Sequence, residues 1–555
     1  MKDMALWNEG DWIAAIAVVI LAAFLVIGAL AITRPKEEVL GHPKGLYVLF
    51  FAEMWERFSY YGMRALLILY LVKHWLYSDG GASLIYGAYT SLVYITPVLG
   101  GWLADRYLGQ RKAVAFGAVL LTFGHFFMAF EGDGSGYAND PTLNIFWLAL
   151  ALIIVGSGFL KANISVIVGQ LYPRTDLRRD SAYTIFYIGI NLGAAAGTII
   201  AGYLGETLGW AYGFGAAGIG MLLGLVVFIL GKPLLKGQGE PPVPAKLKEK
   251  VAGFSLEWLL YGVGLVGVAV IWLLIQFQDA VGWILLLSGI ALLGYVLKEA
   301  FKLDAHSRDR VFAMICIILL MPIFWGLFEQ AGGSVNLFTD RYVDRQGVPT
   351  SLFQSINPIY IILLGPLFAG LWQFLGRRGW EPNTYAKMGL GIAQMGLAFI
   401  VLVWGANAAG DALVPVLFIF LFYLLSTTGE LCLSPVGLSA INRLSVRHMA
   451  SLMMAAFFFG TAGGNFVAGF MGTLMGGEGG HGGEITRDGA LDIYWTMGLV
   501  AVGIGVFVIL VSPLVKKLMH LDTLRDDDVS DDLSGQGEVA EPVGPGAHPA
   551  TDPRS

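Results

Sequence analysis

The residues best able to do chemistry lie inside a stretch of the chain that is otherwise apolar. From Glu53 to Arg64 the sequence reads Glu-Met-Trp-Glu-Arg-Phe-Ser-Tyr-Tyr-Gly-Met-Arg. At 3.6 residues per turn, the polar residues of this stretch fall within an arc of about 140° on a helix, and the opposite face is apolar. These polar residues are Glu53, Glu56, Arg57, Tyr60, Tyr61 and Arg64. The pattern indicates a helix that lines a wet cavity; the alternative is a self-neutralising polar patch between packed helices.

Four other apolar stretches each contain one conspicuous polar residue, namely Lys161, Asn191, Glu329 and Glu430. An ionisable group at mid-bilayer costs at least ~2.5–3.5 kcal/mol, so each charged residue here is a candidate for function. Basic and acidic groups on different helices can pair across a cavity and so reduce this cost. Protonation of the acid breaks such a pair, so these residues suit gates that respond to protons.

The composition indicates which elements position these residues. Of the 555 residues, 56% are hydrophobic and 14% are charged, whereas soluble globular proteins carry about 25% charged residues. Apolar runs of about 20 residues span a bilayer as helices, and the runs alternate too little for barrel strands. The sequence therefore predicts an all-α membrane protein. No basic stripe with interleaved aromatic residues is present, so nucleic acid is not an expected partner.

Fifteen apolar runs are expected to form helices, at 11–33, 44–73, 83–105, 111–130, 143–171, 183–207, 211–232, 256–277, 280–300, 311–333, 355–375, 385–406, 414–441, 449–475 and 491–515. The glycine- and proline-containing stretch 232–250 reads as a linker. Setting aside the first run and the two runs after the linker leaves six helices on each side. This predicts two six-helix bundles around a central site. The expected divisions are 1–43 (an extra helix and linker), 44–232 (the N-terminal bundle), 233–305 (the linker and inserted helix pair), 306–519 (the C-terminal bundle) and 520–555 (a disordered acidic tail).

Basic residues gather in alternate loops, which by the positive-inside rule face the cytoplasm; examples are Arg111, Lys112, Arg308, Arg377 and Lys516. The first run then begins outside and ends inside, in agreement with Arg34 and Lys36 directly after it. A cleaved signal peptide is the rival interpretation of this run, but the segment before it lacks the expected positive charge.

The segment Gly101–Lys112 resembles the loop signature of the major facilitator superfamily, in which Asp105 and Arg106 would latch the cytoplasmic side. Two further motifs resemble the proton-dependent oligopeptide transporters of bacteria: Glu-x-x-Glu-Arg-Phe-x-Tyr-Tyr-Gly at 53–62, and Phe-Tyr-x-x-x-Asn-x-Gly at 186–193. The resemblance covers about residues 42–515. It implies a major facilitator fold and proton-coupled symport of di- and tripeptides into the cytoplasm by alternating access.

The resemblance also implies how a peptide would be held. The peptide carboxylate would contact Arg57, Arg64 and Lys161, its amino group would contact Asn191, Asn357 and Glu430, and its backbone would contact Tyr60, Tyr61 and Tyr94. Phe457 stands where the family commonly has tryptophan, which keeps an aromatic wall but changes its size. A zwitterionic peptide fits a pocket that has cations at one end and an anion at the other, whatever its side chains.

Proton coupling would involve Glu53, Glu56, Arg57, Glu329 and Glu430, and the gating bridges would be Arg64–Glu329 and Lys161–Glu430. Protons are the expected co-transported ion, with no other cofactor and no metal. We expect a multi-pass protein of the bacterial inner membrane that contacts lipid and functions as a monomer.

Two alternatives remain at this stage. The first is the same fold carrying nitrate, a drug or another anion, although nitrate carriers of the larger family typically lack the pair Glu53 and Glu56. The second is a membrane enzyme or receptor, including a transporter-like sensor. The loops contain no metal-ligand cluster, phosphate-binding loop or nucleophile elbow, so an enzyme is not expected, and only a flux measurement separates a sensor from a transporter.

Overall fold

The computed structural model describes residues 7–33, 37–173, 176, 178–251, 253–445, 449–475 and 483–521. Arg34, Lys36 and the acidic tail beyond residue 521 lie outside these described residues. Within them, each of the fifteen expected runs corresponds to one long helix, with ends that agree to within six residues. The length and apolar character of the runs were therefore sufficient to predict the long helices.

The N-terminal bundle is built from six long helices that pack around a shared apolar core. They are α2 (Lys44–Lys73), α3 (Asp79–Leu103), α4 (Gln110–Met128), α5 (Leu143–Gln170), α6 (Arg178–Thr207) and α7 (Trp210–Leu230). A π-helical turn at Ala104–Leu108 follows α3, and a short 3-10 turn at Lys232–Leu235 follows α7. The additional helix α1 (Glu9–Thr33) lies against α6 and α2 of this bundle.

The C-terminal bundle has the same number of long helices in the described part of the chain. They are α11 (Ala305–Phe328), α13 (Ile356–Arg377), α14 (Thr384–Ala409), α15 (Leu417–Leu444), α16 (Ala450–Leu474) and α17 (Arg487–Leu518). The short helix α12 (Ser334–Tyr342) and the parallel strands β5 (Val343–Asp344) and β6 (Val414–Pro415) lie at one end. Side-chain caps fix several helix starts, since Asp304 accepts a bond from Ser307 N (3.1 Å) and Asn383 accepts one from Ala386 N (3.0 Å).

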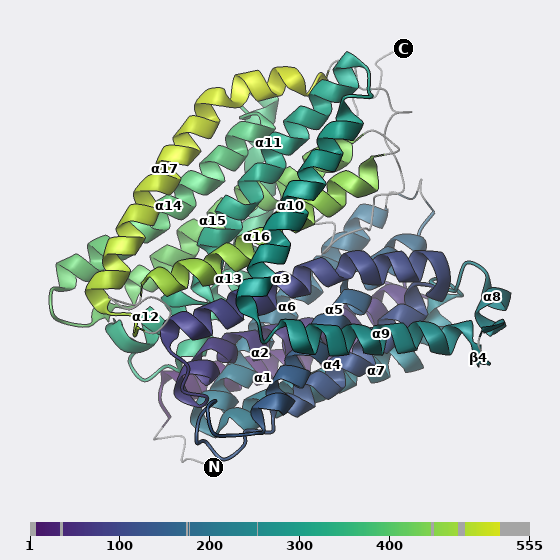
Figure 1. Cartoon of the computed structure of the whole chain (residues 1–555), viewed down its shortest axis with the longest axis horizontal. Helices are drawn as coiled ribbons and strands as arrows, with labels where there is room; N and C mark the ends of the chain where they lie inside the picture. Colours follow the sequence, from purple (N-terminus) through teal and green to yellow (C-terminus); the bar gives the residue numbers. More distant parts are fainter. Residues whose placement is uncertain are drawn as a thin grey trace.

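The inserted segment between the bundles comprises α8 (Pro244–Lys248), the antiparallel strands β3 (Lys250–Val251) and β4 (Phe254–Ser255), and helices α9 (Leu256–Leu274) and α10 (Gln278–Ala300). Helix α9 packs against α5, whereas α10 packs against α16 of the other bundle (Figure 1). Trp272 Nε1 donates to the carbonyl of Asn144, 3.2 Å away, which fixes α9 to the N-terminal bundle. The two inserted helices therefore each accompany a different bundle.

Helices α3 and α16 form a long contact between the bundles, which are inclined to each other in Figure 1. Their backbones approach closely at Gly87 and Gly469, because a Cβ added to Gly87 would lie 2.8 Å from Gly469 Cα. Small residues permit this kind of approach in membrane proteins, where packing drives helix association. Helices α6 and α13 also meet across the bundle boundary.

Thirteen helical segments of the described chain are long and apolar enough to cross a membrane. Helices α2 and α4 are not among them. Helix α2 carries Glu53, Glu56, Arg57 and Arg64, yet all four side chains are buried inside the protein and not exposed on its lipid-facing surface. The protein is therefore a multi-pass helical membrane protein whose most charged long helix is shielded from lipid.

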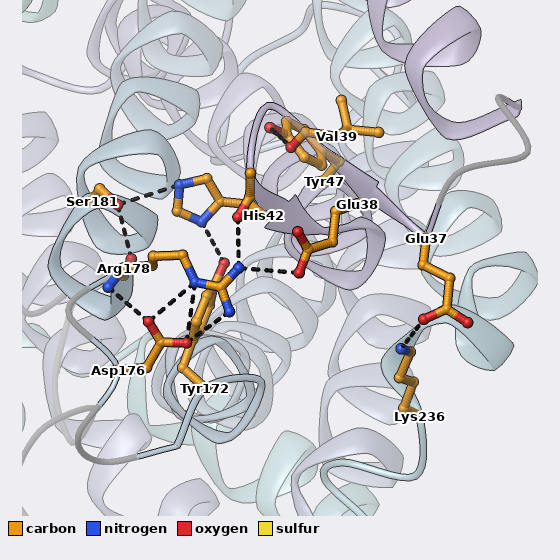
Figure 2. A network of polar contacts seen from close by, with 11 residues as sticks. Glu37, Glu38, Val39, His42, Tyr47, Tyr172, Asp176, Arg178, Ser181 and Lys236 are labelled. Atoms are coloured by element: carbon orange, nitrogen blue, oxygen red, sulfur yellow. Dashed lines mark hydrogen bonds and ion pairs between the residues drawn. The ribbon is translucent and has the colours of Figure 1, made fainter.

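A small antiparallel hairpin connects α1 to α2, formed by β1 (Glu38–Val39) and β2 (His42–Pro43). Figure 2 shows this hairpin against the ends of α5 and α6. Arg178, the first residue of α6, is 3.0 Å from Glu38 Oε1 and donates to the carbonyl of Gly41 at 2.8 Å. Tyr47 of α2 donates to Val39 O (2.9 Å). The hairpin is thus fastened to the ends of two helices in the N-terminal bundle, on the side that the basic-loop pattern assigns to the cytoplasm.

His42 lies at the centre of this hairpin network (Figure 2). Its Nδ1 is 2.7 Å from the hydroxyl of Tyr172, and its Nε2 is 3.2 Å from Ser181 Oγ. Burial and then the positive charge of Arg178 lower the pKa of His42, whereas Asp176 and Glu38 raise it. The net effect favours the neutral imidazole.

Candidate functional site

A central cavity lies between the two bundles and encloses about 1210 Å³, including the part that is open to solvent. Helices α2, α3 and α6 supply one wall, and α11, α13, α15 and α16 supply the other. The candidate residues that line it are Arg57, Tyr61, Arg64, Tyr94, Asn191, Glu329, Asn357, Glu430 and Phe457. The remaining candidates for proton coupling and substrate binding, Glu53, Glu56, Tyr60 and Lys161, are buried but are not among the lining residues.

The two glutamates of the α2 motif flank one arginine. Arg57 Nε is 2.8 Å from Glu53 Oε1 and 3.2 Å from Glu56 Oε2. Glu53 and Arg57 are one helical turn apart, which brings their side chains together on the helix surface. Arg57 reaches the cavity, so the glutamates contact it from inside the N-terminal bundle. Protonation of either glutamate would make the net charge of this cluster more positive, so Arg57 would attract an anion in the cavity more strongly.

Arg64 joins the bundles beside the cavity. Its Nη2 forms an ion pair with Glu329 Oε2, and its Nε donates to the hydroxyl of Tyr86 at 2.6 Å. The same hydroxyl lies 3.5 Å from Glu329 Oε2. Glu329 directly follows α11 in a 3-10 turn (Glu329–Ala331), so a side chain of the C-terminal bundle closes on α2 and α3. The predicted Arg64–Glu329 pair is present in this structure, whereas its role as a gate stays a prediction.

Lys161 of α5 lies among tyrosine rings. Its Nζ is 4.1 Å from the ring centroid of Tyr60 and 5.1 Å from that of Tyr94. An ammonium group over an aromatic face is stabilised electrostatically, and more so where water is excluded. Tyr94 also lines the cavity, so Lys161 is positioned directly behind the cavity wall. Its predicted bridge to Glu430 stays a prediction.

The acidic part of the cavity is centred on Glu430 of α15. Asn357 of α13 donates through Nδ2 to Glu430 Oε2 at 2.9 Å and to Thr427 Oγ1 at 3.0 Å. Asn191 lies across the cavity on α6, where its Nδ2 donates to Tyr187 O at 3.1 Å. The amide of Asn357 therefore orients the carboxylate that the sequence singled out.

Aromatic residues complete the wall on the side of the C-terminal bundle. Trp325 and Phe328 of α11 pack edge to face with centroids 5.2 Å apart, and Phe457 and Phe458 of α16 do so at 5.7 Å. Phe457 is 5% exposed. Aromatic walls bind apolar side chains of many shapes, so this region can receive substrate side chains.

Sequence reasoning gave no role to four polar residues of the site, namely Tyr86, Tyr187, Gln354 and Tyr423. Tyr86 contacts Arg64, and the other three line the cavity. A signal for Tyr86 was available, because Tyr86 and Tyr94 are eight residues apart on α3 and so share one helix face. Tyr187 lies within the 186–193 motif, and nothing in the sequence brought Gln354 or Tyr423 to this cavity.

The predicted cytoplasmic latch lies in the π-helical turn after α3. Asp105 Oδ1 accepts a hydrogen bond from Gln110 Nε2 at 2.7 Å, across Gly109, whose φ of 74° suits glycine. The guanidinium of Arg106 lies 5.9 Å from the ring centroid of Trp102. These contacts stabilise a turn within the N-terminal bundle, and a latching role stays a prediction.

Polar contacts between the bundles gather at the end that the basic-loop pattern assigns to the periplasm. Arg341 of α12 binds Asp79 of α3 with both Nη atoms, at 2.5 and 2.7 Å. Lys73 of α2 is 2.8 Å from Asp340 of α12. Together with Arg64–Glu329, these pairs connect the two bundles at that end.

The protein resembles known transporters over most of its length. A family model described as the POT family matches residues 111–481. The chain belongs to the POT family. The peptide transporter YePEPT of Yersinia enterocolitica is 36% identical over 469 residues, which cover 78% of this chain and 88% of that protein. The di-/tripeptide transporter of Lactococcus lactis is 32% identical and is covered to 88%, with 77% of this chain aligned.

A solved structure agrees with this family assignment. The crystal structure of a mutant of the peptide transporter POT in complex with alafosfalin is 33% identical in sequence and has a TM-score of 0.74. The match covers 89% of this chain and 99% of that one. The POT-family protein described here therefore has the two-bundle major facilitator fold, with the inserted helix pair and the extra helix α1. It is a transporter and not an enzyme.

Proposed function

We propose that this POT-family protein imports di- and tripeptides with protons across a bacterial inner membrane by alternating access. The observation that carries the proposal is the charge distribution of the cavity. Arg57 and Arg64 line it from the N-terminal bundle, and Glu430, oriented by Asn357, lines it from the C-terminal bundle. A short zwitterionic peptide is complementary to such a cavity, and the transporters that this chain resembles carry di- and tripeptide names.

In this proposal the peptide carboxylate binds Arg57 and Arg64, with Lys161 adding positive charge through the tyrosine layer. The amino group binds Glu430, Asn191 and Asn357. Tyr60, Tyr61 and Tyr94 contact the peptide backbone or support the groups that do. Phe457 lies where a substrate side chain would go. Because only the ends and backbone are fixed, the site would accept many sequences and select for length.

Protons enter the cycle through the carboxylates of the site. Protonation of Glu329 would weaken its pair with Arg64 and so release the bundles at the periplasmic end. Protonation of Glu53 or Glu56 would remove negative charge beside Arg57, which would then attract the peptide carboxylate more strongly. Glu430 would bind either a proton or the peptide amino group. Each proton contributes about 2.3 kcal/mol per 100 mV of membrane potential.

The division of the chain supports this cycle. We propose that residues 44–232 and 306–519 move as two bundles, that 233–305 and 1–43 accompany them, and that Asp105 and Arg106 latch the cytoplasmic side. In this scheme the protein works as a monomer in contact with lipid.

Uptake of radiolabelled dialanine into proteoliposomes tests the proposal. With an inward proton gradient and a negative interior, we expect accumulation that collapses when an uncoupler is added. The variant Glu430→Gln should lose this accumulation. Glu381→Gln, whose ion pair with Lys387 lies outside the cavity, is the matched control and should retain it. Exchange without uphill accumulation would support the substrate and reject the coupling. Absence of movement in both modes would reject the peptide proposal and turn the assay to nitrate and other anions.

A further inference from the structure

Helix α1 is attached to the N-terminal bundle at both of its ends. At its start, Asn8 and Asp11 cap each other, with both backbone-to-side-chain bonds at 2.9 Å. The hydroxyl of Tyr203 on α6 donates to Asp11, whose side chain is buried. Beyond its cytoplasmic end, the hairpin is held by Arg178, the first residue of the same α6 (Figure 2).

The middle of α1 packs closely on α2 as well. Leu21 belongs to a buried cluster with Phe50, Phe51 and Trp55. Gly28 lies so close to the ring of Phe51 that an added Cβ would overlap it. Rocking of the bundles would therefore carry α1 with α2 and α6.

The first turn of α1 also contacts the other bundle. A Cβ on Gly10 would lie 2.8 Å from Cδ of Pro349, in the segment between β5 and α13 of the C-terminal bundle. Pro349 directly precedes Thr350 and Ser351, whose backbone N–H groups donate to Glu206 of α6 at 3.0 and 2.6 Å.

One face of α6 thus binds both partners of this contact. Tyr203 and Glu206 are three residues apart, so they lie on the same side of the helix. Tyr203 holds Asp11 of α1, while Glu206 holds the start of the 3-10 turn at Thr350–Ser355. The contact between Gly10 and Pro349 therefore lies beside the other periplasmic contacts between the bundles.

We propose that α1 is an additional part of the periplasmic gate: it is carried by the N-terminal bundle, and its first turn closes on Pro349 of the C-terminal bundle. The inference rests on the alternating access proposed above. Gly10 is required because the Pro349 ring occupies the space of any larger side chain. Asp11 and Tyr203 are positioning residues, because their hydrogen bond fixes the first turn of α1 against α6 and so opposite Pro349.

Gly10→Val tests the contact directly. A valine at this position would have to displace the Pro349 ring, and overpacking of this kind would shift the ratio of closed to open periplasmic ends by roughly tenfold. Spin labels at Asn139→Cys and Asp411→Cys, both exposed periplasmic positions, report the distance between the bundles once Cys316 and Cys432 have been replaced by alanine. We expect Gly10→Val to increase the population at longer distance. Ala23→Val, on the exposed face of the same helix, is the matched control and should leave the distances unchanged.

A second substitution distinguishes a gate from general damage. Pro349→Ala removes the ring atoms that face Gly10 and should restore closure in the double variant Gly10→Val/Pro349→Ala. Tyr203→Phe, which detaches the first turn without enlarging it, should also increase the open population and covers the case in which Gly10→Val does not fold. Unchanged distances in Gly10→Val or Tyr203→Phe would overturn the inference, as would a shift that Pro349→Ala does not reverse. These distances are measured without peptide, so their failure is separate from a failure of dialanine uptake.

Discussion

Substitution of Glu329 by glutamine isolates the charge of one ion pair between the bundles. Arg64 and Glu329 are 7% and 2% exposed, and the amide preserves size and one acceptor. Hydrogen bonds to charged groups contribute about 1.5–3 kcal/mol, against about 0.5–1.5 kcal/mol for neutral ones. Glu329→Gln should therefore destabilise the periplasm-closed arrangement by about 1–2 kcal/mol. That difference corresponds to roughly a 5- to 30-fold change in the ratio of closed to open states.

Two assays measure this change. The labelled pair at Asn139 and Asp411 should show a larger open population in Glu329→Gln, by the factor just given. In proteoliposomes, the freed Arg64 is available to the peptide carboxylate, so the KM for dialanine should fall while the maximal rate of proton-driven uptake also falls.

The matched control is Glu381→Gln. Glu381 forms an ion pair with Lys387 inside the C-terminal bundle, so its neutralisation should change neither the distances nor the uptake. An unchanged closed-to-open ratio in folded Glu329→Gln would refute the assignment of this pair to the gate. An equal shift in Glu381→Gln would refute it too, because the effect would then follow from charge alone.

Three further substitutions address the anionic end, the aromatic wall and the hairpin. Asn357→Leu removes the amide that donates to Glu430 at 2.9 Å, so loss of this hydrogen bond to a charged group should raise the KM for dialanine about tenfold, or 1.4 kcal/mol; an unchanged KM would contradict this. The ring of Phe457 packs closely on Gly437, since a Cβ added to this glycine would lie 3.2 Å from it. The larger ring in Phe457→Trp should therefore take up space in the cavity, so peptides with aromatic side chains should compete less well against dialanine. Equal competition would count against the side-chain pocket. Burial lowers the pKa of His42 below its ordinary 6.5, so the unfolded chain binds more protons and stability falls as the pH drops below about 6.5. The decrease in Tm from about pH 7.5 to about pH 5.5 should be smaller in His42→Gln, and an identical decrease would exclude His42 as its source.

The fold could be predicted because the bilayer imposes length and polarity on each helix separately. The run 44–73 and helix α2 coincide. Of the predicted polar arc on this helix, Arg57, Tyr61 and Arg64 line the cavity, whereas Glu53, Glu56 and Tyr60 are buried away from its lining. The family resemblance implied that Asn191 and Glu430 bind substrate; both line the cavity, and their role stays a prediction. Such predictions need only the order of residues along one helix.

Partners contributed by distant helices could not be predicted in the same way. Tyr86 of α3 contacts both Arg64 of α2 and Glu329, which follows α11. This meeting depends on how three separate helices pack. Glu206 accepts backbone bonds from residues about 144 positions later in the chain, and nothing in the local pattern of either segment signals the other. The burial of Lys161 behind Tyr94 is likewise decided by helix packing and not by sequence spacing.

The glycine contact between α3 and α16 has a mechanical consequence. At Gly87 and Gly469 backbone meets backbone, so at this level of the contact no large side chain opposes a change in the angle between the two helices. We expect the contact energy at this point to change little when the two helices tilt against each other. The preference for one state over another would then come from the ion pairs between the bundles, namely Arg64–Glu329, Lys73–Asp340 and Asp79–Arg341. Substitutions in these ion pairs can therefore change the rate of the cycle and the ratio of its states, while the glycine contact between α3 and α16 stays unchanged.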